Sequence, residues 1–215
     1  MINVSPKHFP DNNKVMLLSG GVDSIAAAHW LSNNYYKSFS AVIHFNHNIQ
    51  AANAKMEKNV IKFCNYFGMS LHIIKNETHK STSEHILREW RLGELSKFCE
   101  RHGVSFNFIT AHHLNDAVES YMDNCLKGTP EYLPISWKTD FVDGYTVWHP
   151  FLKTRKKYFE EHVDKNDLRK YIVEDPSNKN TKYKRNWIRN DLLPLIDERN
   201  LGLESVVFRK FYQNS

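Results

Sequence analysis

A polar, glycine-rich segment follows the first apolar run of the chain and has the residues of a phosphate-binding loop. Val15–Leu18 leads directly into Ser19-Gly-Gly-Val-Asp-Ser24, and strong helix formers come next. Gly20 and Gly21 let the backbone turn sharply and approach a ligand, because they carry no Cβ. The free amides and the dipole of the following helix attract anions, and the serine hydroxyls add donors. The segment predicts a phosphate or pyrophosphate site, with an ordinary helix-capping glycine turn as the alternative.

Two arginines interrupt the apolar stripe of a helix that we expect over residues 84–101. Glu84, Arg88 and Arg91 are spaced i, i+4 and i+7 along this stripe. Charged groups on a buried face need partners. The three residues lie near the N-terminus of the helix, which is expected beside the carboxyl edge of the sheet. Because arginine binds phosphate in a bidentate manner, both arginines are candidate phosphate ligands. A Glu84–Arg88 pair along the helix surface is the alternative.

A histidine and two carboxylates share one face of the next expected helix. His112, Asp116 and Glu119 are spaced i, i+4 and i+7 after an apolar run. Zinc accepts such ligands, but the His-Glu-x-x-His pattern is absent. A carboxylate beside a triphosphate more commonly holds Mg²⁺ together with phosphate oxygens. The predicted magnesium ligands are therefore Asp23 and Asp116, with helix capping by Asn115 or Asp116 as the alternative.

Cations and aromatic residues alternate near the C-terminal end of the chain. Residues 179–189 place Tyr183 and Trp187 among five lysines and arginines. Residues 151–190 hold 12 Lys/Arg and 6 Asp/Glu, which gives this segment a net charge of +6. The whole chain has a net charge of +5, so all other residues together carry a charge of −1. Basic residues mixed with aromatic ones suit RNA, whose unstacked bases stack and whose backbone attracts cations. A solvated basic face explains the charge equally well, and the aromatic pair fits a core equally well.

The composition is that of an ordinary folded protein of a reducing compartment. The chain has 215 residues, of which 41% are hydrophobic and 25% charged, enough for one well-buried domain with a small appendage. No apolar run reaches transmembrane length, and the first residues lack a signal-peptide pattern. The three cysteines stand far apart, so neither a disulfide framework nor a cysteine metal site is indicated. We therefore expect a cytoplasmic protein without a membrane partner.

Strand and helix patterns alternate along most of the chain. We expect strands near residues 14–18, 40–45, 70–75, 104–110 and 145–152, and helices near 22–35, 51–67, 84–101 and 114–126. This alternation predicts an α/β, Rossmann-like parallel sheet of about five strands with helices on both faces. Ligands of such folds bind at the carboxyl ends of the strands. Residues 128–143 show no periodicity, and residues 151–215 are expected to add a short, basic helical extension to a domain over residues 1–150.

In this order, the motifs resemble the catalytic domain of the tRNA(Ile)-lysidine synthetases, members of the PP-loop ATP pyrophosphatase superfamily. The resemblance covers roughly residues 15–195. Glu174-Asp-Pro-Ser-Asn178 and the residues after it are the part most specific to this family. The supporting motifs are Ser19–Ser24, His44-Phe-Asn-His47, Glu84/Arg88/Arg91, His112-His-x-x-Asp116-x-x-Glu119, Lys127-Gly128, Pro150-x-Leu152, Arg155, Glu174–Asn178, Tyr183, Arg185-Asn186, Ile188-Arg189 and Leu193-Pro194.

The resemblance implies an ATP- and Mg²⁺-dependent enzyme. Such enzymes adenylate the C2 oxygen of the wobble cytidine in a CAU-anticodon tRNA, release pyrophosphate, and let lysine displace AMP. By this resemblance the catalytic residues would be Asp23, Asp116, Arg88, Arg185 and Arg189. The ATP site would comprise Ser19, Gly20, Gly21, Val22, Asp23, Ser24, His44, Phe45, Asn46 and His112. The tRNA anticodon stem-loop would contact Arg91, Lys182, Lys184 and Arg185.

Several positions depart from the family pattern. Gln50 and Asn48 stand where the family often has arginine and glycine, and His149 stands where it has arginine. Asn115 and Asn180 replace carboxylates, which could change metal handling. The family normally continues into tRNA-gripping domains, so a homodimer or a partner protein would replace them here. Two other interpretations remain: an enzyme that adenylates another nucleobase or small amide, and a catalytically weak nucleotide- or RNA-binding homologue.

Overall fold

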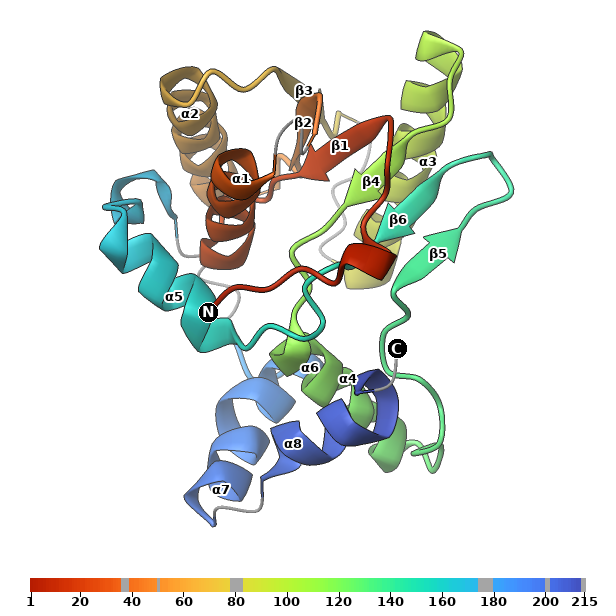
Figure 1. The fold of residues 1–215 in the computed structure, drawn as a ribbon, viewed down its shortest axis with the longest axis vertical. Helices are drawn as coiled ribbons and strands as arrows, with labels where there is room; N and C mark the ends of the chain where they lie inside the picture. Colours follow the sequence, from red (N-terminus) through yellow and green to blue (C-terminus); the bar gives the residue numbers. More distant parts are fainter. Residues whose placement is uncertain (36–38, 50, 78–82, 174–179, 200–201, 214–215) are drawn as a thin grey trace.

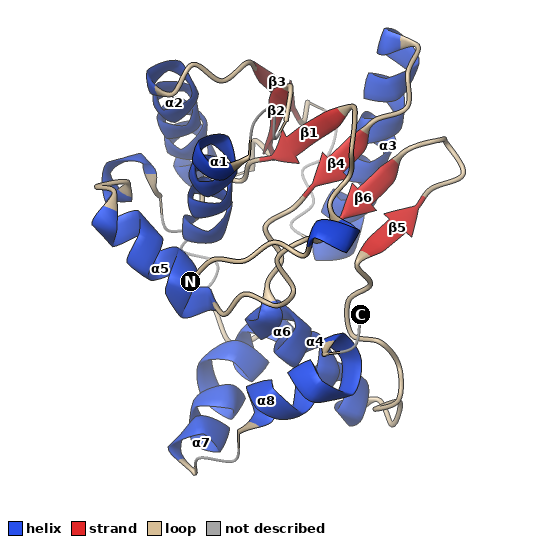
Figure 2. Cartoon of the chain, viewed as in Figure 1, coloured by secondary structure: helices blue, strands red, loops and turns tan. Residues whose placement is uncertain are grey.

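A mostly parallel sheet forms the centre of the computed structural model, which describes residues 1–35, 39–49, 51–77, 83–173, 180–199 and 202–213 (Figures 1 and 2). Its strand order is β3-β2-β1-β4-β6-β5, and all neighbours are parallel except β5 and β6. This confirms the predicted α/β, Rossmann-like fold. The strands are β1 (Lys14–Leu17), β2 (Ala41–Asn46), β3 (Leu71–Lys75), β4 (Asn107–Ile109), β5 (Lys138–Asp140) and β6 (Thr146–Trp148).

The sixth strand is the main difference from the predicted sheet of about five strands. β5 lies inside the stretch 128–143, for which the sequence shows no periodicity. Its three residues are polar and exposed, so they carry no alternating burial signal. The strand exists because it pairs antiparallel with β6 at the edge of the sheet, a tertiary contact that the local sequence does not reveal.

Helices cover both faces of the sheet. Successive residues of a strand point to opposite faces: Met16 joins the core beneath α1, α2 and α5, whereas Val15 joins the core beneath α3. The long helices are α1 (Val22–Asn34), α2 (Ala51–Tyr66), α3 (Glu84–His102), α4 (Leu114–Leu126) and α5 (Lys156–Lys165). No helix within the described ranges is long and apolar enough to cross a membrane.

The last part of the chain forms a layer of short helices on α4, drawn in blue in Figure 1. The helices α6 (Lys184–Trp187), α7 (Leu193–Glu198) and α8 (Leu203–Val207) belong to it, with π-helical turns at Ile188–Leu192 and Phe208–Tyr212. Val207 and Tyr212 are buried against Leu114 and Val118 of α4. By contrast, α5 packs on α1 within the main core. The division of the chain at residue 150 stays a prediction.

The strand order creates a crevice at one edge of the sheet. β1 lies between β2 and β4, and the chain continues from β1 to β2 on one side but from β4 to β6 on the other side. In open α/β sheets ligands bind at this kind of switch point, beyond the carboxyl ends of the strands. The Ser19–Ser24 loop follows β1, and residues 110–113 follow β4. The fold therefore brings two of the predicted motifs to the same crevice.

Candidate functional site

The Ser19–Ser24 loop is held in shape by its own hydroxyl groups. The Ser19 and Ser24 Oγ atoms lie 2.9 Å apart, and the Gly20 amide donates to Ser24 Oγ at 3.2 Å. Gly20 has a φ of +89°, and a Cβ there would lie 3.1 Å from Val60 Cγ2, so this position requires glycine. α1 begins at Val22, within this segment and directly after Gly21. The loop thus has the form of an anion cradle at a helix N-terminus.

A cavity of about 800 Å³ opens in the crevice, and most of the predicted ligand-binding residues line it. Gly20, Asn46, Arg88, Lys182, Lys184 and Arg185 are not among its lining residues. Asn46 instead donates to Glu57 Oε2 at 2.6 Å. The predicted residues that do line the cavity are Ser19, Gly21, Val22, Asp23, Ser24, His44, Phe45, Arg91, His112, Asp116 and Arg189.

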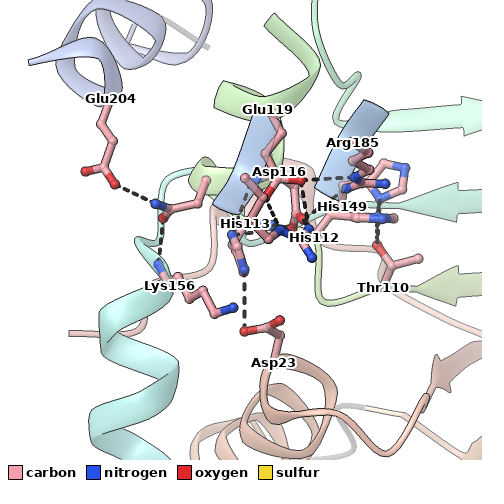
Figure 3. A network of polar contacts seen from close by, with 12 residues as sticks. Asp23, Thr110, His112, His113, Asp116, Glu119, His149, Lys156, Arg185 and Glu204 are labelled. Atoms are coloured by element: carbon pink, nitrogen blue, oxygen red, sulfur yellow. Dashed lines mark hydrogen bonds and ion pairs between the residues drawn. The ribbon is translucent and has the colours of Figure 1, made fainter. Parts of the chain in front are cut away.

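His113 connects the two predicted magnesium ligands (Figure 3). Its Nε2 lies 3.4 Å from Asp23 Oδ1, and its Nδ1 lies 3.3 Å from Asp116 Oδ2. Although burial alone would lower the pKa of His113, the two carboxylates raise it above its ordinary value. Burial likewise opposes ionisation of Asp116, yet His113, His112 and Arg185 lower its pKa to about 2. Asp116 is therefore anionic near pH 7, and the two carboxylates favour protonation of His113.

Arg185 and Arg189 are anchored to α4 by Glu119. Arg185 Nε donates to Glu119 Oε2 at 3.0 Å, and Arg189 Nη2 donates to the same oxygen at 2.7 Å. Arg185 Nη2 also reaches Asp116 Oδ1 at 3.1 Å. Glu119 is only 4% exposed. The sequence placed Glu119 on the face of His112 and Asp116 without a role, and the structure shows that it positions both arginines.

The remaining predicted cations occupy three different environments. Arg91 lines the cavity, and its Nη1 lies 3.2 Å from His47 Nε2. Lys184 pairs with Asp123 at 2.6 Å. Arg88 and Lys182 are exposed. The family string Glu174–Asn178 and Gln50 lie outside the described residues.

Lys156 is a cavity residue that the sequence analysis missed. It begins α5, lines the cavity, and extends toward Asp23 in Figure 3. Its ammonium forms no ion pair within the described part of the chain. A cation that faces a phosphate-type loop without a carboxylate partner is suited to bind an anionic ligand. The sequence signal was weak, because Lys156 is one of three consecutive basic residues.

Asn115 has a structural role that explains its departure from the family carboxylate. Its Oδ1 accepts a hydrogen bond from the Lys156 backbone amide at 2.8 Å. Its Nδ2 donates to Glu204 Oε1 at 2.6 Å. A carboxylate could accept from the amide but could not donate to Glu204. The amide thus ties α5 and α8 to the start of α4.

A buried histidine pair supports one wall of the cavity. His112 Nδ1 and His149 Nδ1 lie 3.0 Å apart, and Thr110 Oγ1 lies 2.6 Å from His149 Nδ1. Burial is the main reason that the pKa of His149 falls to about 3, and repulsion from His112, if protonated, and from Arg88 lowers it further. Burial also lowers the pKa of His112. Both rings are therefore neutral near pH 7, and His149 stands where the family pattern has an arginine.

Acidification should destabilise the protein through His149. The unfolded chain binds this proton below about pH 6.5, whereas the folded chain binds it only near pH 3. The free energy of unfolding should therefore fall as the pH drops through this window, by up to about 1.4 kcal/mol per pH unit for this group. Urea unfolding across the window measures the slope. His149→Asn should reduce the slope of the free energy of unfolding against pH. His85→Asn, on the exposed part of α3, should leave this slope unchanged. Equal slopes in the wild type and both variants would contradict the assignment.

Asp23 offers a carboxylate to a magnesium ion that also binds phosphate oxygens, whereas both oxygens of Asp116 already accept hydrogen bonds, Oδ2 from the His113 backbone amide at 3.0 Å and Oδ1 from Arg185 at 3.1 Å. Asp23 Oδ1 is buried, and within the described residues it makes no hydrogen bond, only the 3.4 Å ion-pair contact with His113 Nε2. The same described ranges contain no group of three His, Cys, Asp or Glu side chains arranged to hold a metal ion. Mg²⁺ commonly takes one or two carboxylates and completes its shell with phosphates and water. The donor set suits that mode of binding and does not suit a closed zinc site.

Known proteins resemble the chain in sequence and in fold. The tRNA(Ile)-lysidine synthase of Staphylococcus aureus (strain MRSA252) is 29% identical over 197 residues, which cover 88% of this chain and 45% of the relative. The enzyme of that name from Thermotoga maritima is 27% identical over 208 residues, 91% of this chain and 48% of the relative. The chain therefore spans about half the length of these relatives.

A solved structure has a similar fold although its sequence identity to this chain is low. The U34-tRNA thiolase NcsA from Methanococcus maripaludis superposes with a TM-score of 0.73 at 19% identity, covering 96% of this chain and 72% of the other. A model of the PP-loop domain matches residues 3–196, almost the whole chain. The chain therefore belongs to the PP-loop domain family.

Proposed function

We propose that this chain is an ATP-dependent tRNA-modifying enzyme that makes lysidine. The wobble cytidine O2 would attack the α-phosphate of ATP, forming an O–P bond while the bond to the leaving pyrophosphate breaks. The ε-amine of lysine would then attack C2 and displace AMP. The observation that carries the proposal is that the Ser19–Ser24 loop, Asp116, Lys156 and Arg189 line the same cavity. The lysidine synthase relatives support the choice of reaction.

The charges around the cavity suit the first step. Negative charge grows on the leaving pyrophosphate as the adenylate forms, and fixed cations stabilise such charge. The loop amides, Lys156 and Arg189 supply donors and positive charge at the cavity wall. Mg²⁺ held by Asp23 and phosphate oxygens would neutralise further charge on the phosphates. Glu119 keeps Arg189 in position, so this donor needs no rearrangement when the charge develops.

The test is a labelling experiment with a CAU-anticodon tRNA, ATP and radiolabelled lysine. Label that enters the RNA together with pyrophosphate release supports lysidine synthesis. Pyrophosphate release without RNA labelling would indicate adenylation with a different nucleophile. ATP binding with neither product would contradict the enzymatic proposal. A homodimer or a partner protein as a second tRNA-binding element remains part of this proposal, and sedimentation with and without tRNA tests it.

His44 should select a nucleotide that brings a hydrogen-bond donor. Its Nδ1 donates to the Leu18 carbonyl at 2.8 Å, since a carbonyl can only accept. Its Nε2 is then an acceptor, and this atom is buried without a partner in the described residues. Burial lowers the pKa of His44, which keeps Nε2 unprotonated. His44→Phe should weaken ATP binding about tenfold, the range of one buried hydrogen bond.

Nucleotide analogues identify the donor that His44 receives. If it is the adenine amine, ITP should bind more weakly than ATP to the wild type and equally to His44→Phe. If it is a ribose hydroxyl, a deoxy-ATP should show that pattern instead. Calorimetric titration measures these affinities. Unchanged ATP affinity in His44→Phe would show that Nε2 faces no donor of the ligand.

A further inference from the structure

Two aromatic side chains are exposed close to the cavity. Tyr183 and Trp187 are 50% and 38% exposed. The Trp187 amide donates to the Tyr183 carbonyl at 2.9 Å, so the two residues are one helical turn apart. Arg189 and Asn190, which follow directly along the helix, line the cavity. Of the two interpretations that the sequence left open, a core position for this aromatic pair is therefore wrong.

The opposite side of the same helix is fixed to α4. Ile188 is 1% exposed, and Arg185 and Arg189 both bind Glu119. Arg185 and Arg189 lie roughly half a turn away from Trp187 around the helix axis, and Ile188 lies roughly a quarter of a turn away. Since that face is anchored, the helix cannot rotate to bury Trp187 without breaking the ion pairs. The contacts that hold α6 against α4 therefore keep Tyr183 and Trp187 exposed.

Two cations that are not bound to carboxylates lie on the segments next to the pair. Glu84 of α3 lies 3.6 Å from Arg185, so the first turn of α3 adjoins α6. Arg88 follows Glu84 by one turn and is exposed, and Lys182 directly precedes Tyr183 and is exposed. Neither cation forms an ion pair within the described ranges. Lys184 and Arg185, by contrast, are held by acidic residues of α4.

We propose that Tyr183 and Trp187 form a stacking platform for unpaired RNA bases, with Arg88 and Lys182 binding the adjoining phosphates. The inference rests on the proposed function and names the surface by which the RNA substrate reaches the cavity. Every base has a π face that stacks on tyrosine or tryptophan, whereas bases inside a duplex are already stacked. The platform should therefore prefer a loop over a duplex. Lys184 and Arg185 would shape this surface instead of contacting the RNA.

Equilibrium RNA binding tests the platform. The probes are a fluorescein-labelled stem-loop with an unpaired CAU loop and the same RNA with its loop paired to a complementary strand, both followed by anisotropy. Trp187→Ala and Tyr183→Ala should each weaken loop binding about 5- to 150-fold and leave duplex binding unchanged. Trp187→Phe should retain most of the affinity. The control is Tyr66→Ala on α2, which removes an aromatic residue that is more exposed than either member of the pair, and it should have no effect.

Salt dependence separates stacking from phosphate contacts. Trp187→Ala should lower the affinity at every salt concentration without changing the slope of log K against log salt. Lys182→Ala and Arg88→Ala should each reduce that slope by about 0.7, the value for one lost contact to a single strand. A reduced slope in Trp187→Ala would overturn the stacking assignment. Unchanged slopes in both cation variants would overturn their assignment to phosphates.

The failure of the platform can be told from failure of the proposed function. If wild-type protein binds the loop RNA and both aromatic variants bind it equally well, the platform is wrong and the RNA-modifying function stands. If wild-type protein binds ATP but neither RNA, the proposed function itself fails. If Trp187→Ala changes only the sedimentation coefficient, the aromatic face contacts protein and the inference is overturned.

Discussion

Asp116→Asn should reduce tRNA-dependent pyrophosphate release at least about 100-fold, the scale expected when a fixed charge at the reacting centre is lost. The substitution keeps the shape of the side chain and removes its charge. Asp116 is nearly buried, and its pKa of about 2 makes it anionic at every working pH. The asparagine cannot neutralise His113 or Arg185. Alanine is a less informative change here, because it would also leave two cations beside an empty buried site.

The control for this change lies on the same helix. Asp123 is seven residues further along α4 and pairs with Lys127 and Lys184 at the surface. Asp123→Asn should retain near-normal turnover. Pyrophosphate release is measured for both proteins at saturating ATP, and thermal melting shows that each is folded. Wild-type turnover in folded Asp116→Asn would remove this residue from the mechanism.

Glu119→Ala should lower the free energy of unfolding by about 3 kcal/mol, near the low end of values for breaking a buried ion pair. The carboxylate is 4% exposed and receives hydrogen bonds from two guanidinium groups. Their side chains remain 39% and 30% exposed, so water compensates part of the loss. Glu119→Gln should cost less, since the amide oxygen can still accept one of these bonds.

Urea unfolding measures both Glu119 variants against a pair whose carboxylate is 18% exposed and whose cation faces water. Glu94 of α3 binds Lys97, whose side chain is 65% exposed, and Glu94→Ala should cost less than about 1 kcal/mol. If Glu119→Ala costs no more than Glu94→Ala, the Glu119 cluster does not stabilise the fold. Because Glu119 also positions Arg189, turnover in folded Glu119→Gln should fall as well.

Local patterns were enough to predict the phosphate loop and most of the sheet. Ser19–Ser24 joins a strand to a helix in six residues, so its chemistry and its position are set by contacts of short range. The apolar runs of β1, β2 and β4 likewise carry their burial in the sequence. β5 carried no such signal because its residues are polar and exposed, and only the pairing with β6 defines it.

The partners of the charged residues could not be predicted in the same way. The sequence placed Arg185 and Arg189 near the phosphates but did not show that Glu119, at least 66 residues earlier, holds them. Nothing local distinguishes Lys156 from the basic residues on either side of it. Its role depends on the position of α5 across the crevice. Side chains that meet only through tertiary packing leave no periodic pattern in the sequence. For this reason the sequence did not predict Lys156 as a cavity residue or Glu119 as the partner of the two arginines.

The two halves of the cavity depend on contacts of very different reach along the chain. The bonds that close the Ser19–Ser24 loop join residues two to five positions apart, whereas Glu119 joins Arg185 and Arg189 across 66 and 70 positions. Closing a long loop costs more entropy, so the arginine half should form late in folding and open first. Partial unfolding that releases α6–α8 would then leave an intact nucleotide cradle without its arginines. Hydrogen exchange should reveal this as weaker protection of the α6–α8 amides than of β1 and α1.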